Sequence, residues 1–117
     1  HTLAAISTIV RMKNKRVILV GNKDILFHFD NSLELNLEVG TRLSLFPLKD
    51  VVGISSEGLK YDIKNIQFSP GYNIGTSNQV SQTKISIKVD GSGMVLILPL
   101  KCLKNILEYL TNCISSK

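Results

Sequence analysis

Hydrophobic positions in this sequence mostly alternate with polar ones or form short continuous runs, which is typical of β-strands. The clearest alternation places Leu33, Leu35 and Leu37 between polar neighbours, so one face of that strand is expected to be buried and the other wet. Similar runs predict strands at 17–20, 25–29, 42–46, 51–55, 59–63, 84–89 and 94–98, with a short one at 65–68. The pattern therefore predicts an all-β domain.

Turn residues separate these runs and suggest how they connect. The segment 21–24 predicts a hairpin between the first two strands, and Asp90-Gly91-Ser92-Gly93 predicts a second hairpin between 84–89 and 94–98. About seven or eight short strands with turns every 8–12 residues or so favour an antiparallel β-sandwich or a flattened barrel.

Both ends of the chain show a helical period instead. Thr2 to Met12 carries apolar residues three to four positions apart, which predicts an amphipathic helix. Near the C-terminus one stripe contains Leu100, Leu103, Ile106, Leu107, Leu110 and Ile114. This second helix is expected to bury its stripe, either on the β domain or on a partner subunit. We expect residues 1–13 to be the last helix of an upstream α/β domain, 16–98 the β domain and 99–117 the C-terminal helix, so a short helix flanks the β domain at each end.

Composition fits one packed domain. The chain has 117 residues, 44% of them hydrophobic, and contains no apolar run of the roughly 18–20 residues that a membrane helix needs. The N-terminus shows no signal-peptide pattern, so we expect a soluble protein without a membrane partner. Cys102 and Cys113 are eleven positions apart in the predicted helix, roughly 16 Å along its axis, too far for a disulfide. Unpaired cysteines favour a reducing compartment, the cytoplasm.

The net charge of +5 opens a second interpretation. Part of this excess positive charge lies at 11–16, near the C-terminus of the first predicted helix. Cations are favourable at a helix C-terminus, so these can be interpreted as ordinary solvated residues. A basic nucleic-acid-binding β-barrel is the alternative, but such proteins stack bases on exposed aromatic residues, and aromatic residues make up only 6% of this chain. Nucleic acid is therefore not the expected partner.

Residue types that usually carry catalysis are scarce. His1 and His28 are the only histidines, and neither has metal-ligand spacing to cysteines or carboxylates. Between two phenylalanines, His28 is expected on the opposite, exposed face of its strand. Asp50, Glu57 and Asp62 are interpreted as solvated residues at strand ends rather than as an acid pair. The sequence predicts neither a catalytic residue nor a metal ligand within this chain.

The segment Gly75-Thr76-Ser77-Asn78 differs in kind. It combines a flexible backbone, two hydroxyls and a carboxamide, which can hydrogen-bond a heteroaromatic ligand. On residue types alone, an ordinary polar turn is the other interpretation.

Three motifs in order carry a resemblance to a known family. They are Ser44-Leu45-Phe46-Pro47-Leu48, the segment 53–61 (GISSEGLKY) and Gly75-Thr76-Ser77-Asn78. Together they resemble the C-terminal domain of thiamine pyrophosphokinase, and the likeness runs from about Arg16 to Leu98. The first residues, HTLAAI, resemble the segment directly after a Gly-x-Arg-x-Asp sequence in that family, which implies that a catalytic domain precedes them in a longer protein.

The resemblance implies a function. In this family the hydroxyethyl oxygen of thiamine attacks the β-phosphorus of ATP and AMP leaves, with Mg²⁺ and ATP held mainly by the upstream domain. This chain would supply the thiamine pocket, with polar contacts from Ser77 and Asn78 and a turn shaped by Gly75 and Thr76. The site is completed across a homodimer in the family, so this chain alone is expected to be inactive.

The chain departs from the family pattern at two places. Family members often have an acidic residue and then a large aromatic after the Ser-Asn pair, where this chain has Gln79-Val80. Which residue stacks on thiamine is therefore open. The second place is the first hairpin turn, 21–24, which often carries acidic residues in the family. This chain has GNKD there, so no role is assigned to the turn. A non-catalytic module that oligomerises through the C-terminal helix remains a further alternative.

Overall fold

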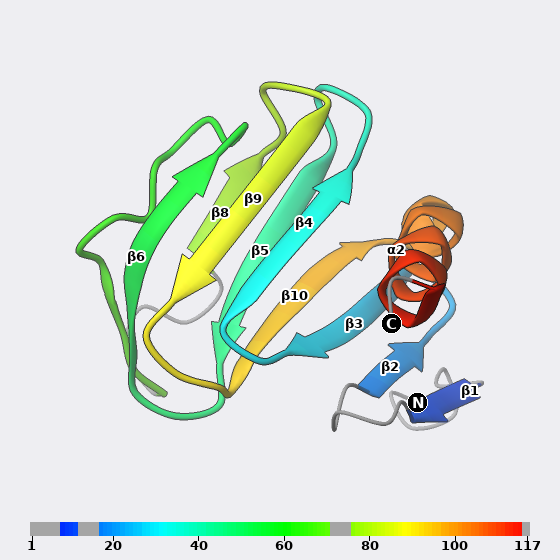
Figure 1. Cartoon of the computed structure of the whole chain (residues 1–117), viewed down its shortest axis with the longest axis horizontal. Coiled ribbons are helices and arrows are strands. Elements are labelled where there is room, and N and C mark those ends of the chain that lie inside the picture. Colours follow the sequence, from blue (N-terminus) through cyan, green and yellow to red (C-terminus); the bar gives the residue numbers. More distant parts are fainter. Residues whose placement is uncertain (1–7, 12–16, 71–75, 116–117) are drawn as a thin grey trace.

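The computed structural model describes residues 8–11, 17–70 and 76–115. Within these ranges, two antiparallel sheets pack against each other and a helix follows them at the C-terminal end (Figure 1). The predicted all-β antiparallel fold is confirmed, and of the two expected arrangements the chain adopts the sandwich.

The larger sheet has six strands among the described residues. Their order is β1 (Thr8–Arg11), β2 (Val17–Val20), β3 (Asp24–Phe29), β10 (Met94–Pro99), β5 (Arg42–Pro47) and β8 (Thr76–Gln79). The predicted hairpin between β2 and β3 is present, with Val20 opposite Ile25. Strand β10 lies inside the sheet, paired with β3 on one side and β5 on the other.

The smaller sheet has four described strands. Their order is β4 (Ser32–Asn36), β9 (Lys84–Val89), β6 (Val51–Glu57) and β7 (Gln67–Phe68). A register shift between Gly53 and Ser55 marks a bulge in β6 against β9. Beyond it, the outer face of β6 carries Ser55 and Glu57, next to Lys88 and Ser86 of β9.

The core lies between the sheets and follows the alternation of the strands. Phe27 and Phe29 of β3 are fully buried, and His28 between them is half-buried on the other face, so the prediction that His28 faces away from both is confirmed. Leu33 and Leu35 of β4 are also buried, and their polar neighbours are exposed. Burial of these apolar side chains is the main term that stabilises such a sandwich.

The predicted N-terminal helix is wrong over Thr8–Arg11, which form strand β1. β1 pairs with β2, and Ile9 lies opposite Leu19. An apolar spacing of three to four residues favours a helix, but pairing with a neighbouring strand decides the conformation here. The rest of the predicted helix lies outside the described residues.

The predicted hairpin between 84–89 and 94–98 is also wrong. Both strands exist, but β9 belongs to the four-stranded sheet and β10 to the six-stranded one. The segment 90–93 therefore crosses between the sheets. It is fixed at both ends, because Asp90 Oδ1 accepts from the Val52 N–H at 2.8 Å and the Leu48 N–H donates to the Gly93 carbonyl at 2.6 Å.

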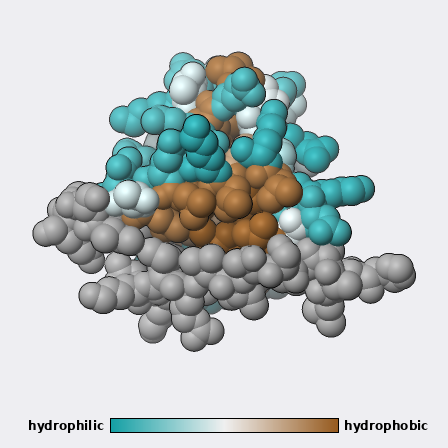
Figure 2. Space-filling model, turned by 90° about the vertical axis from the view of Figure 1, so that its right-hand side faces the viewer, coloured by the Kyte–Doolittle hydropathy of each residue, from teal (hydrophilic) through white to brown (hydrophobic). Residues whose placement is uncertain are grey.

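The C-terminal segment forms a short 3₁₀ helix, η1 (Leu100–Cys102), and then α2 (Leu103–Ser115). Ile106 and Leu110 of α2 are buried in the core, so the helix docks on the β domain, as one of the two alternatives predicted. Leu107 of the same stripe is 44% exposed. Figure 2 views the molecule from the right-hand side of Figure 1 and shows hydrophobic surface gathered in a band below hydrophilic surface.

Cys102 is buried and is not part of a disulfide. Burial raises the pKa of its thiol above the ordinary value, which keeps the sulfur protonated and unreactive. In the described part of the chain, no helix is both long and apolar enough to span a membrane.

Candidate functional site

The segment predicted as a polar turn is largely a strand. Gly75 lies outside the described residues, and Thr76–Gln79 form β8, antiparallel to β5. Thr76, to which the sequence assigned a part in shaping a turn, lies opposite Leu45. Polar residues with weak periodicity gave no strand signal, and the ladder with β5 supplies the hydrogen bonds that fix this segment.

Strand geometry separates the two residues expected to contact a ligand. Ser77 lies opposite Ser44 and is exposed, whereas Asn78 lies opposite Leu43 and is only 4% exposed. Because successive side chains point to opposite faces of a sheet, Ser77 and Asn78 face different sides. Ser77 is accessible to a ligand, and Asn78 faces the interior.

The carboxamide of Asn78 is occupied by backbone groups. Its Oδ1 accepts from the Tyr61 N–H at 3.0 Å and from the Gln79 N–H at 2.9 Å, and its Nδ2 donates to the Tyr61 carbonyl at 2.8 Å. A buried amide must be satisfied in this way, since leaving it unpaired is costly. Asn78 thus binds the backbone of Tyr61 as a neighbouring strand would.

The segment 58–62 is attached to β8 at several points. The Lys60 N–H donates to the Gln79 carbonyl at 2.8 Å, and Leu59 forms an isolated bridge with Val80. The predicted strand at 59–63 is therefore wrong: this bridge is its only ladder contact among the described residues. Gly58 has φ +78°, a conformation that side chains rarely adopt, and this bends the chain after β6.

Tyr61 is the functional candidate that the sequence did not single out. Its side chain is 57% exposed, and Lys60 Nζ lies 5.4 Å from the centroid of its ring. The sequence placed Tyr61 in a strand, and nothing in the pattern brings it next to Asn78, seventeen positions later. The fold brings the backbone of Lys60 and Tyr61 beside Gln79 and Asn78 of β8, whereas the Ser77 side chain lies on the opposite face of that strand from Asn78.

Asp62 stabilises the same segment. Ser56 Oγ donates to Asp62 Oδ1 at 2.7 Å, and the Lys64 N–H donates to the same oxygen at 3.1 Å. These hydrogen bonds, the one from Ser56 first, lower the pKa of Asp62 below its ordinary value. Asp62 therefore organises a turn outside the strands, rather than being only a solvated residue at a strand end as the sequence suggested.

Metal ligands are not grouped in the described residues, where no three of the His, Cys, Asp and Glu side chains could hold one ion. The described residues therefore offer no group of ligands for magnesium, and no step of a reaction is assigned to a metal held by them. The grooves lined by residues of the four-stranded sheet and α2 include neither Ser77 nor Asn78.

Comparison with known proteins identifies the family. The family model described as the thiamin pyrophosphokinase, vitamin B1 binding domain, matches residues 30–94, from just before β4 to the first residue of β10. The chain belongs to this family. The match includes β5, segment 58–62 and β8, the elements that carry the candidate residues Tyr61, Ser77 and Asn78. It does not favour a nucleic-acid-binding barrel or a non-catalytic oligomerisation module.

A curated relative supports membership. Thiamin pyrophosphokinase 1 of Caenorhabditis elegans is 29% identical over 100 residues, which cover 79% of this chain and 41% of the relative. The chain thus matches less than half the length of that thiamin pyrophosphokinase.

Solved structures share the fold. Thiamine pyrophosphokinase from Bacillus subtilis matches with a TM-score of 0.63 and 16% identity, over 74% of this chain and 42% of that one. Thiamin pyrophosphokinase from Geobacillus thermodenitrificans matches with a TM-score of 0.58 and 18% identity, over 70% and 39%. At these identities the similarity shows the sandwich fold.

Proposed function

We propose that this chain is the thiamine-binding part of an enzyme that transfers pyrophosphate from ATP to thiamine, giving thiamine diphosphate and AMP. The match of residues 30–94 to the vitamin B1 binding domain carries the proposal. The relative named thiamin pyrophosphokinase 1 is more than twice as long as the matched region, so the transfer reaction is assigned to a longer protein. ATP and Mg²⁺ are expected to bind mainly to its upstream part, and the chain alone is expected to catalyse no turnover.

The geometry suggests how thiamine is held. Thiamine has a flat aminopyrimidine and a cationic thiazolium ring, and an exposed tyrosine face attracts both kinds of group. Lys60 lies over the Tyr61 ring, so we assign the opposite ring face to the ligand. Tyr61 belongs to the segment 53–61 that carries the family resemblance, and we propose it as the residue that stacks on thiamine.

The predicted contacts receive different roles in this proposal. Ser77, which is exposed, donates or accepts a hydrogen bond with the ligand directly. Asn78 positions the Tyr61 backbone through its two hydrogen bonds and acts on the ligand mainly through Tyr61. Gly75 and Thr76 remain predicted contacts, at the N-terminal end of β8.

A homodimer is proposed as the working form, because the family resemblance implies a site completed across two copies of the chain. The cytoplasm is the proposed location, on the basis of the free Cys102.

Thiamine titration followed by amide NMR tests the binding proposal. Thiamine added to the 117-residue chain should shift the amides of 58–62 and 76–79, with an affinity weakened by the absence of the upstream part. Tyr61→Ala and Ser77→Ala should each reduce the shifts, and Ser86→Ala, on the other sheet, should leave them unchanged. Shifts spread evenly over the chain, or none at millimolar thiamine, would contradict the proposal.

The activity is tested in the longer protein. Expressed with its upstream part, the enzyme should form thiamine diphosphate and AMP from thiamine and ATP. Tyr61→Ala should raise KM for thiamine about tenfold or more, with little change in KM for ATP, because a lost stacking contact weakens binding of one substrate only.

A further inference from the structure

A row of three exposed polar side chains crosses the six-stranded sheet at its β8 edge, on the face turned away from the core. Arg42 of β5 lies opposite Gln79 of β8. The Lys60 N–H donates to the Gln79 carbonyl, next to the Leu59–Val80 bridge, so Lys60 continues the row on the other side of β8. Residues opposite each other in antiparallel strands direct their side chains to the same face. Arg42 and Lys60 therefore flank Gln79, and all three are exposed.

Two hydroxyl groups lie in the next row of the same face. Ser44 and Ser77 are opposite each other, two positions along β5 and β8 from Arg42 and Gln79. Side chains two positions apart in a strand share a face, and their Cα atoms are roughly 7 Å apart. Ser77 is exposed and Ser44 is half-buried. The two rows thus present a guanidinium, an ammonium and two hydroxyl groups, all of which donate hydrogen bonds.

The two cations of this face are not neutralised by nearby carboxylates. Neither Arg42 nor Lys60 forms an ion pair with another residue that the structure describes. Asp62, two positions after Lys60, accepts hydrogen bonds within the turn that it organises, and Asp24 of β3 is separated from Arg42 by β10. The contact of Lys60 Nζ with the Tyr61 ring, 5.4 Å from the ring centroid, leaves the ammonium charged. The face therefore has a local excess of positive charge.

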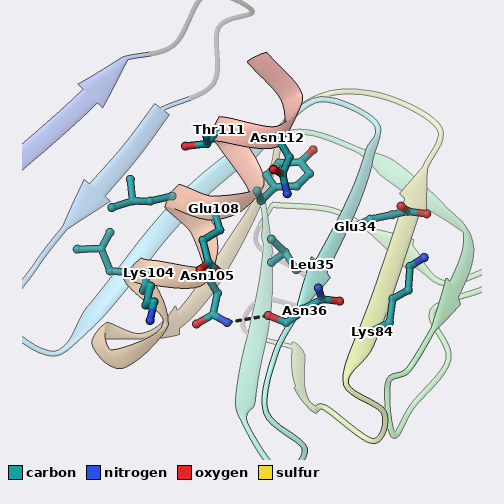
Figure 3. A pocket seen from close by; sticks show the side chains of 12 residues that line it. Glu34, Leu35, Asn36, Lys84, Lys104, Asn105, Glu108, Thr111 and Asn112 are labelled. Carbon is teal, nitrogen blue, oxygen red and sulfur yellow. Dashed lines mark hydrogen bonds between the residues drawn. The ribbon is translucent and has the colours of Figure 1, made fainter. Parts of the chain in front are cut away.

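The groove between β4 and α2 has a different balance of charges (Figure 3). Its volume is about 1000 Å³, and two glutamates and two lysines, Lys84 and Lys104, are among the residues that line it. Asn105 Nδ2 of α2 donates to the Asn36 carbonyl of β4 at 2.8 Å, so helix and strand already contact each other there. Opposite charges balance in this groove, and its lysines are suitable controls for the two cations beside β8.

We propose that Arg42, Lys60, Ser44 and Ser77 bind a phosphoryl anion, a diphosphate or a phosphate ester, on the outer face of the six-stranded sheet. A guanidinium can hold two phosphate oxygens at once, an ammonium adds a point charge, and hydroxyl groups donate to further oxygens. Neighbouring strands are about 4.8 Å apart, which places the Cα atoms of Arg42 and Lys60 about 10 Å from each other. Both long side chains can therefore reach one phosphate group above Gln79.

The proposed reaction offers one source of this anion. Thiamine itself is a cation and gains nothing from Arg42 and Lys60, whereas the diphosphate group of thiamine diphosphate is attracted by both. If the thiamine rings lie near Ser77, the diphosphate of the product lies on the same face as the two cations. This link to the product rests on the proposed function, but binding of inorganic diphosphate does not.

The test titrates sodium diphosphate into the 117-residue chain at constant ionic strength, followed by amide NMR. Saturable shifts are expected at 42–44, 60 and 77–79, and sodium chloride of equal ionic strength should not produce them. Thiamine diphosphate and thiamine are titrated separately. Tighter binding of thiamine diphosphate than of inorganic diphosphate identifies the product as the ligand, and equal binding identifies a separate phosphate site. Shifts with thiamine but none with either diphosphate overturn this inference and leave the proposed function standing.

Variants of the chain complete the test. Arg42→Ala and Lys60→Ala should each weaken diphosphate binding about fivefold or more, and Lys84→Ala should change it less than about twofold. Gln79→Glu places a carboxylate between the two cations and should weaken binding at least about tenfold, whereas Thr83→Glu adds the same charge outside the two rows. All five positions are exposed, and circular dichroism checks the fold of each variant. Equal weakening by Gln79→Glu and Thr83→Glu, or shifts that never saturate, overturns the proposal.

Discussion

The side chain of Asn78 makes two hydrogen bonds with the backbone of Tyr61: its Oδ1 accepts from the Tyr61 N–H at 3.0 Å, and its Nδ2 donates to the Tyr61 carbonyl at 2.8 Å. Asn78→Ala should therefore lower the free energy of unfolding by about 2 kcal/mol, because buried backbone partners lose their bonds. Urea unfolding measures the change. Asn105→Ala is the matched control, since its half-buried side chain also donates to a backbone carbonyl, in a hydrogen bond exposed to solvent, and it should cost clearly less. Equal costs for the two variants would show that the Asn78 bonds are not special.

Gly58 and Gly40 form a second matched pair. Both have positive φ, +78° and +94°, but a Cβ on Gly58 would collide with the Lys84 carbonyl, whereas a Cβ on Gly40 meets nothing within 4 Å. Gly40→Ala should cost about 1 kcal/mol from backbone strain alone. Gly58→Ala should cost more, about 3 kcal/mol or above, and loosen segment 58–62 as seen by hydrogen exchange. A smaller loss for Gly58→Ala than for Gly40→Ala would contradict this account.

Two leucines of α2 should respond differently to truncation. Leu110 is 4% exposed and Leu107 is 44% exposed. Leu110→Ala should destabilise the chain by about 2–4 kcal/mol, as is usual for a buried leucine, and Leu107→Ala by less than about 1 kcal/mol. Thermal unfolding compares them. If Leu107→Ala were the more harmful, the side of α2 that faces the sandwich would have to be reassigned.

Thr41 offers a stabilising change. Its hydroxyl is buried without a hydrogen-bond partner among the described residues. Thr41→Val replaces this hydroxyl with a methyl group of similar size and should stabilise the fold by about 1 kcal/mol, because the desolvation cost of the hydroxyl disappears. Thr83→Val at an exposed position is the control and should change stability little. A destabilised Thr41→Val chain would indicate that the hydroxyl is paired in solution.

Asp62 should add a pH dependence in acid. Its pKa is lowered in the fold by the hydrogen bonds from Ser56 and the Lys64 backbone. Because the pKa of Asp62 is lower in the folded chain than in the unfolded chain, ionised Asp62 stabilises the fold at pH values above the ordinary aspartate pKa. This contribution is lost as the pH falls through the pKa of the folded chain. Asp62→Asn should therefore flatten the acid limb of a plot of urea midpoint against pH. An acid limb of the same slope in Asp62→Asn would assign that dependence to other carboxylates.

Alternation along single strands was predictable from sequence, and long-range pairing was not. The burial of Leu33, Leu35 and the phenylalanines beside His28 follows from a local period of two. The partners of β9 and β10 depend on which sheet each strand enters, and a turn such as 90–93 is compatible with a hairpin or with a crossing between sheets. Thr8–Arg11 likewise have a helical spacing that pairing with β2 overrides.

The site was predictable in part, for the same reason. Ser77 and Asn78 could be named from residue types and family motifs, but their separation onto opposite faces follows from β8, which has no sequence signal of its own. Tyr61 could not be joined to them, because the bonds that do so span seventeen positions. Residue types thus suggested which groups could contact a ligand, and the fold showed that Ser77 is exposed and Asn78 is buried; their contact with thiamine stays a prediction.

Strand β10 lies between β3 and β5, although it is the last strand in the described chain. During synthesis on a ribosome, β3 and β5 emerge long before the strand that joins them. Until Met94–Pro99 leave the exit tunnel, both strands present unpaired backbone edges to other chains in the cell, and such edges promote aggregation. The sandwich therefore closes only near the end of translation of this region, and chaperones that shield exposed strands would act on it during that interval.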